Sequence, residues 1–244
     1  MKAFFKYLFI QFKMDLRDRG LLLNYYLIPI IFFFVMGSVF SSINPLSKST
    51  LCVVLTIFGV TMGAVMGAPV PLVKMRESGT LRAYKVSGIP APAVLAVHAL
   101  SAFIHLIIVS IIILLISPAV FNTDMAPNLP LYFGVLAVFL ITNIGIGLLI
   151  GVAARNQSMA TMFSMIVFLP SIMISGIMFP LKMLPEAVWN VARIFPATDA
   201  MQAFQGLVFG MQTQFDAGVS LGITAGIGII AFALAIWRYN VNEV

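Results

Sequence analysis

The sequence predicts an all-α, polytopic membrane protein. It should have six transmembrane helices, an interfacial helix at the amino terminus and short re-entrant helices before the last span. Of the 244 residues, 61% are hydrophobic and only 9% are charged, and the mean hydropathy is +1.07. A soluble domain carries roughly a quarter charged residues, so this chain lacks the polar surface of a water-facing globule. The apolar residues also gather into six long runs separated by short polar loops.

The same composition excludes other classes of protein. The one cysteine, Cys52, has no intrachain partner, which excludes a disulfide scaffold. The net charge of +6 could suggest nucleic acid, but the basic residues lie in loops between apolar runs. That pattern is typical of a membrane protein whose Lys and Arg stay on the cytoplasmic side.

Each of the six runs is long enough to cross a bilayer, which takes about 20 apolar residues in a helix. None has Lys, Arg, Asp or Glu in its interior, where one such residue costs about 2.5 to 3.5 kcal/mol on insertion. The expected spans are Leu21–Ser42, Thr50–Val73, Ala91–Ser117, Leu131–Ala154, Ser158–Leu181 and Ala217–Trp237.

The distribution of basic residues predicts the direction of the spans. With both termini in the cytoplasm, the outer side holds only Lys48, Lys182 and Arg193. The inner side then holds Lys2, Lys6, Lys13, Arg17, Arg19, Lys74, Arg76, Arg82, Lys85, Arg155 and Arg238. This bias predicts a multi-pass protein of the cell membrane with its amino terminus inside.

Residues 1–20 are predicted to form an interfacial helix rather than a cleaved signal, because charges from Lys13 to Arg19 interrupt the apolar run. At 100° per residue, one face carries Phe5, Leu8, Phe9, Phe12 and Leu16. A basic stripe lies beside it, formed by Lys2, Lys6, Lys13 and Arg17. The alternative is a helical extension of the first span.

The cytoplasmic loop over residues 74–90 carries helix signals. Ser78 is expected to cap a short helix through Thr80–Tyr84, which Gly88 and Pro90 then end. These signals favour a helix that docks a partner. The alternative is a loop whose Lys and Arg serve only to orient the chain.

Outside, Pro170, Gly176 and Pro180 interrupt the fifth apolar run. A broken helix is tolerated at membrane depth only where protein or a water-filled cavity satisfies its backbone. Pro185 suits the first turn of one short helix, and Asp199 is expected to cap a second that ends near Gly210. The two helices would cover the outer leaflet over residues 181–216.

Small residues repeat every four positions in three spans and predict helix-packing faces. They are Gly59, Gly63 and Gly67 in the second span, Gly147 and Gly151 in the fourth, and Gly218, Gly222 and Gly226 in the sixth. Whether a face joins two copies of the chain is open, since packing within one chain uses the same spacing.

The spans offer little chemistry. Their ionisable residues are His98 and His105, two turns apart and too distant to share a metal, and they are expected to be buried, hydrogen-bonded structural residues. No zinc motif, carboxylate pair or phosphate-binding Gly-x-x-x-x-Gly-Lys occurs, so we expect no catalytic residues and no metal or nucleotide held by this chain. If ATP drives the protein, another chain binds it.

The arrangement resembles the membrane permease of type-2 ABC exporters, and the resemblance covers nearly the whole chain. It is carried by Glu77-Ser-Gly-Thr-Leu-Arg after the second span and by the Phe179-Pro, Leu184-Pro and Phe195-Pro pairs after the fifth. The resemblance implies one permease domain over residues 1–244. It also implies a dimer of permeases with two ATP-binding subunits, which would hold ATP and Mg²⁺.

The resemblance further implies that the loop is a coupling helix that sits in a cleft of the ATPase. The residues concerned are Glu77, Ser78, Gly79, Thr80, Leu81, Arg82, Ala83 and Tyr84. The second and fifth spans would line the path of an amphipathic or hydrophobic cargo such as a drug, an antibiotic or a lipid-like molecule. Candidate path residues are Met62, Met66, Phe163, Met165 and Phe168, which suit varied apolar ligands but are also ordinary lipid-facing residues.

Glu77 is the sharpest single candidate. It could anchor the amino terminus of the coupling helix, contact a basic group of the ATPase, or be a solvated surface charge. The competing function is an ATP-independent secondary transporter, or a binding subunit of an importer. An inverted repeat would favour the secondary transporter, and the sequence shows none strong enough to support it.

Overall fold

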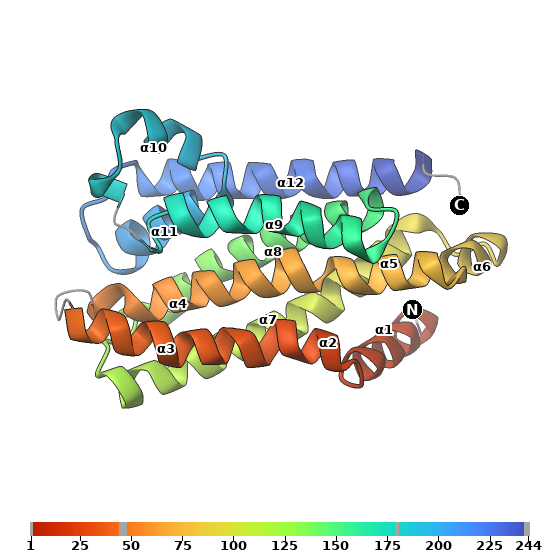
Figure 1. Ribbon diagram of the computed structural model, residues 1–244, viewed down its shortest axis with the longest axis horizontal. Coiled ribbons are helices and arrows are strands. Elements are labelled where there is room, and N and C mark those ends of the chain that lie inside the picture. Colours follow the sequence, from red (N-terminus) through yellow and green to blue (C-terminus); the bar gives the residue numbers. More distant parts are fainter. Residues whose placement is uncertain (1, 44–47, 179–180, 242–244) are drawn as a thin grey trace.

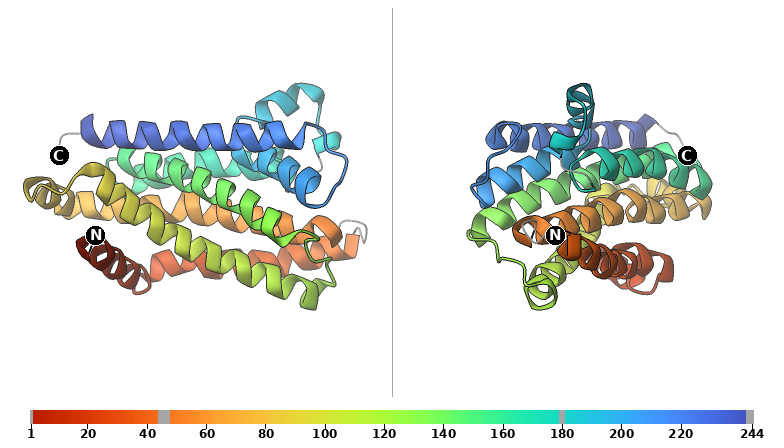
Figure 2. Two further views of the ribbon diagram at one scale, coloured as in Figure 1. Left: turned by 180° about the vertical axis from the view of Figure 1, so that it is seen from behind. Right: turned by 60° about the vertical axis from the view of Figure 1, so that its left-hand side comes forward.

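The computed structural model describes residues 2–43, 48–178 and 181–241, and every regular element within them is a helix (Figure 1). Six helical segments are long and apolar enough to cross a bilayer, which confirms the predicted fold class. They cover Arg19–Val39, Thr50–Glu77, Pro92–Phe121, Leu129–Ala153, Gln157–Ile174 and Ala217–Val241. The segments lie side by side along the long axis of the molecule (Figures 1 and 2).

The first helix, α1 (Lys2–Asp15), is separate from the first span, which comprises α2 (Arg19–Leu22), the π-helical turn η1 (Leu23–Leu27) and α3 (Ile28–Ile43). Asp18 forms the break, with extended backbone and a side-chain oxygen that accepts from the N–H groups of Gly20 and Leu21 at 2.9 and 3.3 Å. A capped break means that α1 is not a continuation of the span. Figure 1 shows α1 bent away from α3.

The second span is the central helix of the chain. It consists of α4 (Lys48–Met62), the π-helical turn η3 (Gly63–Gly67) and α5 (Pro69–Glu77), and 94% of its most apolar window is buried within the protein. In the first, fifth and sixth spans that share is only 28%. Most of the core therefore surrounds the second span. The first, fifth and sixth spans, called the outer spans below, turn much of their apolar surface away from the protein.

Glycines let neighbouring helices approach this central span. A Cβ on Gly63 would lie 2.4 Å from a side-chain carbon of Leu106 in the third span, and one on Gly67 would lie 2.8 Å from the ring of Tyr25 in the first. A Cβ on Gly147 would lie 2.1 Å from the backbone oxygen of Ala64. Atoms this close leave no room for a side chain, so the first, third and fourth spans contact the second span closely.

Two of the sixth-span glycines have open space beside them. At Gly222 and Gly226 a Cβ would meet no atom of the described residues within 4 Å. At these two positions the predicted face is therefore not packed against the described part of the chain. Spacing by four places residues on one helix face, but it does not say which way that face points.

The third span is α7 (Ala91–Phe121), the fourth α8 (Leu129–Ala153), the fifth α9 (Gln157–Ile174) and the sixth α12 (Ala217–Val241). Asparagines mark three of their ends. Asn128 and Asn156 cap α8 and α9 by accepting from backbone N–H groups at 3.0 and 2.9 Å, and Asn122 ends α7 in a left-handed conformation with φ of 51°.

The segment before the last span contains the two short helices that the sequence predicts, α10 (Glu186–Ala192) and α11 (Pro196–Ala203). They follow a single turn, η4 (Leu181–Met183), and precede the π-helical turn η5 (Phe204–Val208). All these elements lie at the end of the bundle opposite α1 and the carboxyl terminus (Figure 1). Phe179 and Pro180, used in the prediction, lie outside the described residues.

Two details of this segment differ from the prediction. Pro185 occupies the cap position before α10 instead of its first turn. Asp199 does not cap α11, because Phe195 holds that position and Asp199 lies within the first turn of the helix. Its fully buried carboxylate instead forms an ion pair of 3.2 Å with Arg193, whose guanidinium also lies over the ring of Phe215.

Candidate functional site

A short helix, α6 (Thr80–Val86), projects beyond the end of the second span (Figure 1). Only Ser78 and Gly79 separate it from α5. Ser78 closes α5 through an N–H bond to the carbonyl of Lys74 at 2.9 Å, and Gly79 takes the positive φ of 73° that the sharp turn requires. Ser78 therefore ends α5 instead of capping α6 as the sequence suggested, and its hydroxyl lies 2.8 Å from that of Thr80.

One face of α6 packs against the protein, and the other is exposed. Leu81 is buried, and the ring of Tyr84 packs edge-on against Tyr7 of α1 with 5.7 Å between centroids. Burial, reinforced by Tyr84, raises the pKa of the Tyr7 hydroxyl above its ordinary value. Arg82, Ala83 and Val86 are exposed, and Val86 keeps 83% of its accessible surface. The exposed face could meet a partner, and Leu81 could not.

Glu77 and Arg76, at the end of α5, hold the turn between the fourth and fifth spans. A carboxylate oxygen of Glu77 accepts from the N–H of Gln157, the first residue of α9, at 3.0 Å. The Arg76 guanidinium donates to the carbonyl of Val152 at 3.0 Å and to that of Ala154. Both carbonyls belong to the carboxyl end of α8.

The structure thus gives Glu77 a partner that sequence reasoning had not considered. Arg76 was counted only among the cytoplasmic charges. The signal that could have revealed the pair is a charged Arg-Glu doublet at the end of one span, together with the polar turn Arg155–Gln157 between two others. Helix ends need such partners because the first N–H groups and the last C=O groups of a helix have none within it.

A polar cluster, formed by Gln11, Asp15, Tyr26, Ser101 and His105, fastens α1 to the first and third spans. The buried Asp15 carboxylate accepts from Ser101 at 2.6 Å and from Gln11 at 2.7 Å, and it lies 4.0 Å from the His105 ring nitrogen Nε2. The other ring nitrogen of His105 is 2.7 Å from the Tyr26 hydroxyl.

Both histidines are buried and hydrogen-bonded, as the sequence analysis expected. His105 belongs to the polar cluster, and its ring stacks between Phe12 and Tyr25. His98 lies 3.1 Å from the sulfur of Met75. Asp15 was missed, because it stands among the charges from Lys13 to Arg19 and helical periodicity alone does not show that it turns toward the third span.

The five candidate path residues are not brought onto one open surface. Met62 and Phe168 are buried within the chain, Met66 and Phe163 are half-buried, and Met165 is 42% exposed. The reason is the central position of the second span, whose residues face neighbours on nearly all sides. The fifth span contacts it directly, since the Ser164 hydroxyl donates to the carbonyl of Val65 at 2.7 Å.

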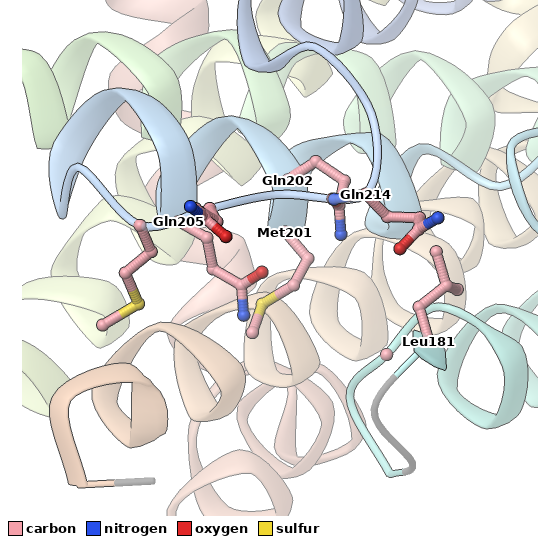
Figure 3. Close-up of a pocket in the computed structure, with 8 residues that line it drawn as sticks. Leu181, Met201, Gln202, Gln205 and Gln214 are labelled. Atoms are coloured by element: carbon pink, nitrogen blue, oxygen red, sulfur yellow. The ribbon is translucent and has the colours of Figure 1, made fainter. Parts of the chain in front are cut away.

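A cavity of about 220 Å³ opens at the end of the bundle opposite α6 (Figure 3). It lies between α11 and η5, the chain that leads into α12, and Leu181 of η4. Its walls carry four glutamines, Gln202, Gln205, Gln212 and Gln214, together with Met201. The Gln202 side-chain oxygen is engaged by the N–H of Gln214 at 2.8 Å. No charged side chain of the described residues lines the cavity. Its wall is therefore neutral and carries amide groups and thioethers.

Six apolar spans and a short exposed helix beyond the second span are the features of a polytopic membrane protein. The chain belongs to the ABC-2 type transporter family, whose model matches residues 3–209. This finding agrees with the resemblance drawn from the sequence.

Curated relatives support the same family. The chain is 28% identical over 153 residues to a "Probable multidrug ABC transporter permease", YbhS of Escherichia coli (strain K12), covering 62% of this chain and 40% of that protein. A "Probable multidrug ABC transporter permease", YbhR of the same organism, is 25% identical over 136 residues, or 56% of this chain and 37% of that protein. ABC transporter G family member 20 of Dictyostelium discoideum is 27% identical over 139 residues, or 57% and 19%. The matches span less than half of each relative.

Proposed function

We propose that the chain is the permease subunit of an ATP-driven exporter whose ATP and Mg²⁺ are bound by separate cytosolic ATPase subunits. The observation that carries this proposal is the exposure of α6. Its residues Arg82, Ala83 and Val86 lie on the surface of the protein, while Leu81 anchors the helix to the bundle. A short helix exposed at one end of a membrane bundle suits docking to a soluble partner. Family membership supplies the class of that partner.

The transported compound is proposed to be amphipathic or hydrophobic, and to move outward by alternating access. Two relatives carry the word multidrug in their names, which supports this class of cargo. The apolar, methionine-bearing surface of the fifth span supports it as well. Met162, Met165 and Met173 are all more than 40% exposed there.

We propose that two permease copies act together, with both termini in the cytoplasm. The outer spans of a single chain keep large apolar faces uncovered, and a second copy or lipid would cover them. The cytoplasmic assignment rests on the basic residues near α6, including Lys74, Arg76, Arg82 and Arg155.

Copurification and cross-linking test the docking proposal. In a Cys52→Ala background, Arg82→Cys and Val86→Cys should each cross-link to an ATPase that copurifies with the chain. Leu81→Cys, whose side chain is buried, is the matched control and should not react. An intact complex in which neither exposed cysteine reaches the ATPase would contradict docking on α6. Gradient-driven uptake by the chain alone would favour a secondary transporter.

A further inference from the structure

We infer that Arg76 and Glu77 form a clamp that makes the fifth span follow the movements of α6. The clamp consists of these two side chains and the backbone groups that they hold, the carbonyls of Val152 and Ala154 and the N–H of Gln157. The inference rests on the proposed function, because it takes α6 to be the helix that the ATPase displaces.

The charges of the clamp match the helix ends that they meet. The last carbonyls of a helix carry partial negative charge, and the first N–H groups carry partial positive charge. Arg76 meets the carbonyl end of α8, and its neighbour Glu77 meets the N–H end of α9. Two adjacent residues of one span thus hold both sides of the turn between two others.

The connection from α6 to the clamp is short. Glu77 ends α5, and α6 begins three residues later at Thr80. The turn between them is closed by the N–H of Gly79 on the carbonyl of Arg76 at 3.0 Å. A displacement of α6 is therefore passed to the clamp through a turn of two residues, alongside the direct contact of Tyr84 with Tyr7 of α1.

The fifth span is packed loosely enough to follow. Only 28% of its apolar window is buried within the chain, so little packing holds it in place. The second span holds it at two levels, through Glu77 at the inner end and through the bond from Ser164 to Val65 farther along. Beside the clamp, the buried side chains of Val73, Ala154 and Ala160 form a small apolar contact.

Single substitutions can break the clamp from either side. Glu77→Ala removes the acceptor. Gln157→Pro removes the N–H donor, and proline is well tolerated at the first position of a helix. Glu77→Gln keeps an oxygen that can accept. Arg76→Gln removes the cation that holds the carboxyl end of α8. Its matched control is Arg155→Gln, because Arg155 is an exposed cation in the turn between α8 and α9.

The readout is the distance between spin labels at Arg82→Cys on α6 and Met162→Cys on α9, measured in nanodiscs in a Cys52→Ala background. Glu77→Ala and Gln157→Pro should each widen the distance distribution about twofold. The double variant should widen it no further, because both substitutions remove the same hydrogen bond. Arg76→Gln should also widen it. Glu77→Gln and Arg155→Gln should leave it as in the unmodified chain.

A second label pair reports transmission. In the complex with its ATPase, labels at Met162→Cys and Trp237→Cys should change separation when ATP and vanadate trap the nucleotide. This change should be lost in Glu77→Ala and Gln157→Pro while the same amount of ATPase stays bound. A purely structural role would lower the amount of complex and leave its response intact.

The outcomes separate the two proposals. If no ATPase copurifies with the unmodified chain, the proposed function fails, and the α6–α9 distances still decide on the clamp. If the ATPase binds and Gln157→Pro behaves like the unmodified chain, the clamp is overturned. A loss confined to Glu77→Ala and Glu77→Gln would overturn it too, and would move the role of Glu77 to the ATPase surface.

Discussion

Asp15 and Asp199 are buried carboxylates that the protein accommodates in different ways. Asp199 has a cation, Arg193, at 3.2 Å, whereas Asp15 has the hydroxyl of Ser101 and the amide of Gln11. Burial raises the pKa of both groups, and these partners partly oppose the rise. Each carboxylate fixes a peripheral helix, Asp199 in the segment before the last span and Asp15 in α1 at the opposite end of the bundle.

Arg193→Gln should lower the free energy of unfolding by about 2–4 kcal/mol at neutral pH, because it leaves a buried carboxylate without its cation. Without Arg193 the pKa of Asp199 rises further above 3.8. The penalty belongs to the ionised form, so it is present above the raised pKa and disappears as pH falls below it. Thermal unfolding in detergent between pH 4.5 and 8 measures this.

In the same experiment, Arg193→Gln combined with Asp199→Asn should recover much of the lost stability, because the double variant has no buried charge. A loss that is equal at every pH, and is not recovered by Asp199→Asn, would show that Arg193 acts through its contact with Phe215 and not through Asp199.

Asp15→Ala should loosen α1, because it leaves Ser101 and Gln11 without their acceptor, at a cost of about 1–3 kcal/mol for each buried polar group left unpaired. Trypsin should then cleave at Lys13 and Arg17 several times faster in nanodiscs. Asp124→Ala, at an exposed aspartate, is the control. Cleavage at the unmodified rate would show that apolar contacts alone hold α1.

At the scale of elements, the spans and their order follow from hydropathy, because length and apolar content are sufficient to identify a membrane helix. The separate α1 helix and the two short helices before α12 also follow from breaks and helix-start residues. The π-helical turns, the cap role of Glu77 and the direction in which Gly222 and Gly226 point do not. Each of these depends on which neighbour a helix face meets, and a single sequence does not contain that information.

Gly147→Ala should destabilise the protein by about 1–3 kcal/mol, because its methyl group would overlap the Ala64 carbonyl and push the fourth span from the second. Gly226→Ala is a matched control in another span, where a methyl group meets open space, and it should be neutral or slightly stabilising. Unfolding by increasing mole fractions of SDS compares the two. Equal stability of the two variants would contradict the close packing of these spans.

For the whole molecule, one central span carries α6, the proposed docking helix, at one end, and the less buried first, fifth and sixth spans lie around it. The candidate coupling residues were named from the sequence, but their division between a buried anchor, Leu81, and an exposed face needed the fold. For the candidate path residues, the fold contradicts part of the choice made from sequence. They were chosen as apolar residues on two spans, and two of them, Met62 and Phe168, prove to be core residues.

The most direct measurement concerns the source of energy. Proteoliposomes would contain the purified chain with or without the ATPase that copurifies with it, and an amphipathic dye that cells producing both proteins extrude. We predict dye movement only with both proteins and hydrolysable Mg-ATP, and none with a non-hydrolysable analogue. Dye movement at the full rate by the chain alone, without ATP, would contradict the account.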